Sequence, residues 1–107
     1  MSEIRKRTLG ALIFDGFETL DLFGPLEMFG TLEDHFTIKL VGETSGAVIS
    51  RHGQTVMPDA TVGQDSRYDM LLIPGGRGTP IENARPLIDA WLVDQSLTAE
   101  YVLSVCT

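Results

Sequence analysis

The sequence predicts an α/β fold in which a mainly parallel β-sheet is flanked by helices. Short, almost continuously apolar runs bounded by turn residues recur along the chain, and such runs are typical of strands covered on both faces. Segments with helical spacing of apolar residues lie between these runs, which is the alternation that parallel sheets with crossover helices require. The chain has 107 residues, so residues 1–107 fit within one domain and leave no room for two.

The first apolar run, residues 9–14, predicts a buried strand that ends at Asp15 and Gly16. A helical stripe follows, formed by Leu22, Leu26 and Phe29. Pro25 either opens this helix or kinks it near its start, and Gly30 is a suitable stop.

A second strand is predicted over residues 36–41. The runs 48–51 and 54–57 flank the turn residues 52–53, which indicates a β-hairpin. Pro58 disfavours a central strand at this point, because proline cannot donate a hydrogen bond to a neighbouring strand.

Residues 69–73 predict a third buried strand, which is closed by the Pro-Gly-Gly turn at 74–76. Residues 79–82 have the spacing of a capping box with proline at the first helical position, and Pro86 divides this region from a longer helix. The longer helix is placed by Leu87, Ile88, Trp91, Leu92 and Gln95. Residues 101–105 predict a fourth buried strand.

Composition excludes several classes of function. The formal net charge of −7 argues against binding nucleic acid or anionic lipid through a basic surface, and no apolar run approaches the ~18 residues of a membrane span. The basic first residues are not followed by the apolar stretch of a secretory signal, and a single cysteine cannot form an internal disulfide, so we expect a cytoplasmic protein. His35 and His52 show no zinc-binding spacing with this cysteine, so we expect no metal.

The predicted topology brings three distant segments together. In a parallel sheet the carboxyl ends of the strands share one edge, and ligands bind along that edge. Residues 15–16, 74–76 and 106–107 each follow a predicted strand. We therefore expect these segments to lie close to one another.

Cys106 has two interpretations. Free cysteine is among the most buried residue types, so it can be a small apolar side chain at the end of a core strand. It also falls where a strand turns into the next segment, which is the position of the nucleophile in a nucleophile elbow.

The glycines and acids at this edge also have two interpretations each. Gly75 and Gly76 can form a tight turn with positive φ, or they can present backbone N–H groups as an oxyanion hole. Asp21, which is flanked by apolar residues, can cap a helix or can act as a buried acid that exchanges protons with the thiol. Glu18 and Glu27 lie in or beside the same turn.

Three motifs of the chain, taken together and in order, resemble the ThiJ/PfpI superfamily. They are residues 14–29 with Leu-Asp-Leu-Phe-Gly-Pro, residues 73–76 with Ile-Pro-Gly-Gly, and residues 104–107 with Ser-Val-Cys-Thr. The resemblance implies the class I glutamine-amidotransferase-like fold, which is flavodoxin-like. The first and last motifs are most similar to the isocyanide hydratase branch, and they also resemble the sensor half of GlxA-type AraC-family regulators.

The resemblance also implies roles for particular residues. Cys106 would be the nucleophile, Asp21 its acidic partner, Gly75 and Gly76 the backbone donors, and Thr107 a supporting hydroxyl. Proteolytic members carry histidine where this chain has Thr107, and the deglycase branch carries glutamate where it has Asp21, so neither activity is favoured. Members usually act on a small molecule as homodimers without a cofactor.

The function implied is that of a cysteine-dependent hydratase or hydrolase acting on a small electrophile, as in the conversion of an isocyanide to an N-formamide. The alternatives are a ligand-sensing domain of a regulator and a redox or glyoxalase-like stress protein. Family members continue well beyond the nucleophile strand, so we expect residues 1–107 to be the front part of one truncated domain that leaves some of its sheet exposed.

Overall fold

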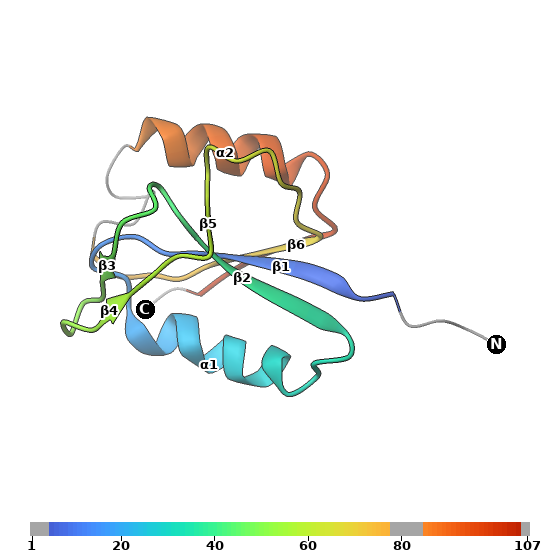
Figure 1. The fold of residues 1–107 in the computed structure, drawn as a ribbon, viewed down its shortest axis with the longest axis horizontal. Helices are drawn as coiled ribbons and strands as arrows, with labels where there is room; N and C mark the ends of the chain where they lie inside the picture. The colour runs from blue at the N-terminus through green and yellow to red at the C-terminus, as the bar shows by residue number, and fades with distance from the viewer. Residues whose placement is uncertain (1–4, 78–84, 106–107) are drawn as a thin grey trace.

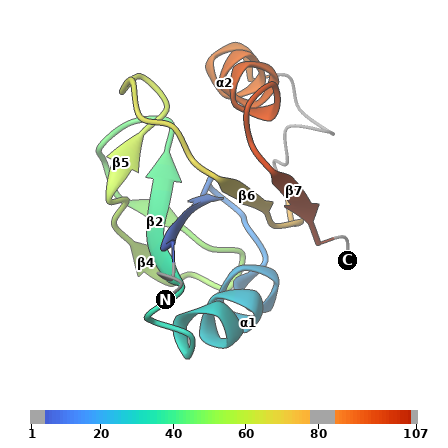
Figure 2. The same ribbon diagram turned by 90° about the vertical axis from the view of Figure 1, so that its right-hand side faces the viewer.

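Five parallel strands form the central sheet, in the order β5-β2-β1-β6-β7 (Figures 1 and 2). The structure is a computed structural model, and it describes residues 5–77 and 85–105. The strands are β1 (Arg7–Leu12), β2 (Phe36–Gly42), β5 (Ala60–Thr61), β6 (Met70–Ile73) and β7 (Tyr101–Ser104). Neighbouring strands pair in parallel, with Leu9 opposite both Ile38 and Met70, which confirms the predicted fold class.

The two helices lie on opposite faces of this sheet, as Figure 1 shows. Helix α1 (Thr19–Gly30) follows β1, and helix α2 (Pro86–Ser96) precedes β7. Pro86 occupies the start of α2, where its missing N–H costs no intrahelical hydrogen bond. Pro25 lies inside α1 and does not open it, so the helix begins before this proline.

Each face of the sheet has its own core because the side chains of a strand alternate between faces. One cluster, which includes Leu9 and Leu72, is joined by Leu22 of α1. The other cluster joins Leu71 to Ile88 and Trp91 of α2. Burying an apolar side chain of this size stabilises the folded state by about 1.5–3 kcal/mol. Packing in these two clusters therefore holds the helices against the sheet.

A two-stranded antiparallel hairpin stands apart from the main sheet. It consists of β3 (Val48–Ile49) and β4 (Thr55–Val56), which are shorter than the predicted runs. Gly53 at its tip has a φ of +93°, a conformation that glycine adopts without steric cost. The predicted hairpin is therefore confirmed.

The strand predicted over residues 101–105 is not buried. Tyr101 and Val102 of β7 are 58% and 47% exposed, because β7 is the edge strand beyond β6 and no described helix covers it (Figure 2). The short parallel strand β5 at the opposite edge was not predicted. The helix start expected at 79–82 lies outside the described residues. Within the described ranges, no helix has the length and apolar character to cross a membrane.

Candidate functional site

The turn between β1 and α1 packs directly against the loop that follows β6. The Glu18 amide donates to the Gly75 carbonyl oxygen over 2.9 Å, and the Arg77 amide donates to the Gly16 carbonyl oxygen over 3.1 Å. An isolated antiparallel bridge joins Phe17 to Gly76 between these two contacts. Two of the three segments predicted to meet at the carboxyl edge of the sheet therefore do so.

The described chain that leads to the third predicted segment ends beside the same loop. The Val105 amide donates to the carbonyl oxygen of Ile73 over 3.0 Å, so the residue before Cys106 runs beside the end of β6. Cys106 and Thr107 themselves lie outside the described residues, and their predicted roles stay predictions.

Asp21 is a buried acid in the first turn of α1. Its side chain accepts a hydrogen bond from the Gly75 amide, with 3.3 Å between Oδ2 and N, and the residue is 6% exposed. The N-cap position belongs to Glu18, so the interpretation of Asp21 as a capping residue is wrong. The carboxylate instead ties α1 to the Pro-Gly-Gly loop.

The backbone at Gly76 leaves no space for a side chain. Its φ is +124°, and a Cβ atom there would lie 2.5 Å from the Gly16 carbonyl oxygen and 2.6 Å from the Glu18 nitrogen. Gly16 faces it with a φ of +89° and an equally close approach to the Arg77 carbonyl oxygen. The tight-turn interpretation of Gly76 is therefore correct. Gly75 presents its amide to Asp21, so that N–H group is already engaged by a carboxylate.

Glu18 has surroundings that sequence reasoning did not anticipate. Its Oε2 atom is buried and makes no hydrogen bond within the described chain, and the Arg51 Nη1 and His52 Nε2 atoms each lie 3.7 Å from it. The Arg51 amide also donates to the Phe17 carbonyl oxygen over 2.8 Å. The tip of the β3–β4 hairpin thus covers the turn, a long-range contact for which the sequence carries no local signal.

An almost wholly apolar groove of about 630 Å³ adjoins Asp21. Its described lining includes Met28 and Phe29 from α1 together with Val105 beyond β7. Asp21 is the one charged residue among the described residues that line it. The groove therefore brings the buried acid and the segment leading to Cys106 to a common apolar surface.

Metal-binding side chains do not gather at this site. Within residues 5–77 and 85–105, no three His, Cys, Asp or Glu side chains are grouped as they would be to hold a metal ion. Glu18 and Asp21 each face partners of other kinds, namely cationic side chains and a backbone amide. The groups that the described part of this site offers are therefore two carboxyl groups, each held by a partner other than a metal ion.

The chain is similar to known proteins in both sequence and structure. The chain is 32% identical over 100 residues to the isonitrile hydratase of Pseudomonas putida, a match that covers 92% of this chain and 43% of that protein. It also matches the crystal structure of a ThiJ/PfpI family protein from Pseudomonas syringae, with a TM-score of 0.87 and 28% identity over 96% of this chain and 43% of that one. The chain thus spans less than half the length of these two proteins.

A more distant structure has the same fold. Drosophila melanogaster DJ-1beta superposes with a TM-score of 0.82 at 16% identity, covering 96% of this chain and 56% of that one. The family model described as the DJ-1/PfpI family matches residues 8–107. With this match over nearly its whole length, the chain belongs to the DJ-1/PfpI family.

Proposed function

We propose that the protein is a cysteine-dependent hydratase that adds water to a small electrophile of the isocyanide type. The observation that supports this most is the placement of buried Asp21 against Gly75, in an apolar groove that Val105 also lines. The 32% identity to an isonitrile hydratase points to the same reaction.

The groove suits such a substrate because an isocyanide has a small polar head on an organic group that is often apolar. The described wall provides apolar surface from Met28, Phe29 and Leu32, which would remove that organic group from water. Asp21 would be the group available to exchange a proton with the reacting atoms.

In the proposed reaction the Cys106 sulfur forms a bond to the isocyanide carbon, and that carbon gains a proton from the thiol by way of Asp21. Water then adds across the C–N double bond, with its oxygen on the carbon and one proton on the nitrogen. As the new hydroxyl group becomes the formyl carbonyl, the C–S bond breaks and the hydroxyl proton returns to the sulfur. The net change is the addition of one water molecule to the isocyanide, which gives the N-formamide. No oxidant or reductant enters this balance.

Asp21 can move protons only if its carboxyl group stays fixed near the reacting atoms. The hydrogen bond from the Gly75 amide fixes one oxygen, and burial keeps the group out of bulk water. Gly75 would thereby serve as a positioning residue for Asp21.

The test is an assay of the full-length protein with an alkyl isocyanide and, separately, with methylglyoxal. We expect formamide to form from the isocyanide, and we expect Cys106→Ala to abolish it. Unchanged turnover in Cys106→Ala would remove this cysteine from the mechanism. Saturable binding of the isocyanide without turnover in the wild type would favour the ligand-sensing alternative, and preferential turnover of methylglyoxal would favour the glyoxalase-like one.

A further inference from the structure

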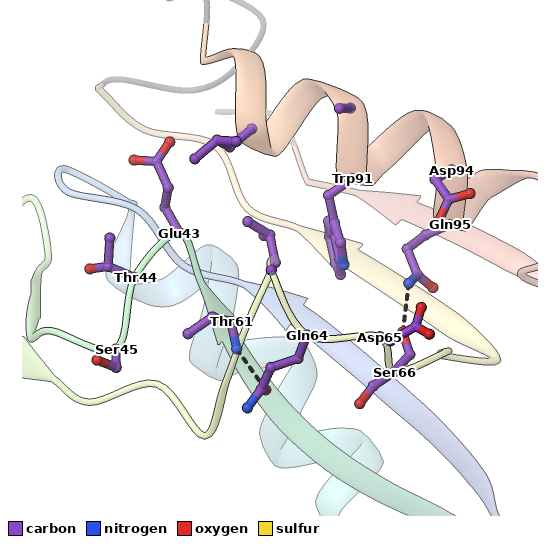
Figure 3. Close-up of a pocket in the computed structure, with 14 residues that line it drawn as sticks. Glu43, Thr44, Ser45, Thr61, Gln64, Asp65, Ser66, Trp91, Asp94 and Gln95 are labelled. Carbon is purple, nitrogen blue, oxygen red and sulfur yellow. Dashed lines mark hydrogen bonds between the residues drawn. The ribbon is translucent and has the colours of Figure 1, made fainter.

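A second cavity, of about 820 Å³, lies on the α2 side of the molecule. Figure 3 shows it between α2 and the loops that follow β2 and β5. It shares no described lining residue with the groove beside Asp21. Its volume falls within the roughly 300–1,000 Å³ that is usual for small-ligand sites. It is therefore a separate candidate site, independent of the proposed hydratase function.

The wall of this cavity is held in place by hydrogen bonds between its own residues. Gln95 of α2 is 2% exposed, and its Nε2 donates to the Ser66 carbonyl oxygen over 2.7 Å while its Oε1 accepts from the Tyr68 amide over 3.2 Å. Gln64 Oε1 accepts from the Thr61 amide over 3.1 Å. The Gln95 contacts join the loop at 61–66 to α2, and the Gln64 contact closes the loop on itself. Figure 3 draws the Gln64–Thr61 and Gln95–Ser66 contacts.

The charge of the lining selects the class of ligand. Glu43, Asp65 and Asp94 contribute carboxylates, and none of the described lining residues is Lys, Arg or His. Asp94 is neutralised by Arg67 at 2.9 Å, whereas Glu43 and Asp65 have no ion pair within the described chain. A phosphate or carboxylate ligand would be repelled by these groups. The lining thus favours a neutral or cationic ligand that donates hydrogen bonds.

Trp91 favours a hydroxylated ligand over a cationic one. The residue is 6% exposed and lines the cavity, and its indole Nε1 makes no hydrogen bond within the described chain. In Figure 3 its side chain projects from α2 towards the loop that carries Gln64 and Ser66. An unpaired buried N–H group needs an acceptor, and an ammonium group has none to offer, whereas a hydroxyl group both donates and accepts.

The remaining lining fits the same ligand. Leu87 is 63% exposed, and with Ala90 and Val62 it provides an apolar wall beside the carboxylates. Sugars combine an apolar C–H face with hydroxyl groups that donate to carboxylates and accept from indole N–H groups. We propose that this cavity binds a neutral polyhydroxylated ligand of the sugar class, with Glu43 and Asp65 accepting from its hydroxyl groups and Trp91 donating to one of them.

The single tryptophan makes this proposal directly measurable. Trp91 is the only tryptophan of the chain, so its indole N–H gives one resonance in a ¹H–¹⁵N spectrum. Nε1 is shielded from solvent, so a ligand hydroxyl would reach it only if the side chains that cover it move outward on binding, with the Gln95 contacts kept. Titration with D-glucose, D-ribose or sucrose is expected to shift the indole resonance and the amide resonances of the loop at 61–66, with half-saturation at or below about 10 mM for at least one sugar.

Variants on the rim of the cavity provide the control. Glu43→Gln and Asp65→Asn are each expected to weaken sugar binding roughly tenfold, because each loses a charged acceptor. Glu33→Gln, which removes the same charge from an exposed position outside the cavity, is expected to leave binding unchanged. Glucose 6-phosphate is expected to bind more weakly than glucose because of the carboxylates.

Three results would overturn the proposal. One is the absence of a saturable shift at the indole resonance with any of these sugars. Another is equal weakening by Glu33→Gln and Asp65→Asn. The third is saturable binding of spermidine together with no binding of sugars, which would show that the carboxylates serve a cation.

Discussion

The Asp21 carboxylate lies 3.3 Å from the amide nitrogen of Gly75, a residue 54 positions later in the chain. This contact joins the first turn of α1 to the loop after β6, which places a buried acid at the carboxyl edge of the sheet. The proposed chemistry depends on this placement.

Gly76→Ala is expected to destabilise the fold by about 2–4 kcal/mol, because a methyl group would enter backbone atoms 2.5–2.9 Å away and would also strain a φ of +124°. Gly53→Ala separates these two causes, since Gly53 has a φ of +93° with nothing within 4 Å of the added Cβ. It is expected to cost about 1 kcal/mol. Urea denaturation of both variants measures the difference, and equal losses would show that the close contact at Gly76 is relieved without cost.

The stability contribution of Asp69 is expected to disappear in acid. The hydrogen bond from the Thr8 amide and the nearby Arg5 guanidinium hold the pKa of Asp69 below its ordinary value of 3.8, although partial burial acts in the opposite direction. A lowered pKa in the folded state means that the contribution is complete above about pH 4 and is lost as pH falls through the folded-state pKa.

Asp69→Asn is therefore expected to lower the free energy of unfolding by about 1 kcal/mol at pH 7, and by much less once the pH has fallen below the folded-state pKa of Asp69. Asp65→Asn, an exposed carboxylate without a hydrogen bond within the described chain, is the control and should show little pH-dependent difference. Denaturant unfolding across this pH range tests the prediction. A difference between Asp69→Asn and wild type that stays constant with pH would contradict it.

Gln95→Ala is expected to cost about 2–4 kcal/mol, because it leaves the buried Tyr68 amide and the partly buried Ser66 carbonyl oxygen without their side-chain partner. The same change should loosen the loop at 61–66, which hydrogen exchange at the Tyr68 amide would detect. Ser96→Ala on the exposed side of α2 is the comparison and should cost under about 1 kcal/mol. Unchanged exchange at Tyr68 in Gln95→Ala would show that the loop is held by other contacts.

Much of the fold could be predicted because it follows from local patterns. The apolar runs at β1, β2 and β6 and the stripe of α1 indicated a parallel sheet, and the parallel sheet indicated which turns share an edge. The exposure of β7 could not be predicted, because an apolar run does not show whether another element covers it. The strand β5 was missed because its two residues carry no usable periodicity.

The candidate site was predicted in part. The meeting of the Asp15–Gly16 turn with Gly75 and Gly76 follows from topology, whereas the choice of Gly75 as the partner of Asp21 depends on the exact path of the loop. The approach of Arg51 and His52 to Glu18 depends on how the hairpin folds over the turn, which no spacing in the sequence encodes.

The most direct test of the central claim is the turnover of an alkyl isocyanide by full-length protein carrying Asp21→Asn, with Glu27→Gln as the matched control on the exposed side of α1. Asparagine keeps an acceptor for the Gly75 amide but cannot exchange a proton, so kcat is predicted to fall by roughly 10²–10⁴-fold while the fold is retained. Glu27→Gln is predicted to leave kcat unchanged. An Asp21→Asn protein that hydrates the isocyanide at the wild-type rate would contradict the account.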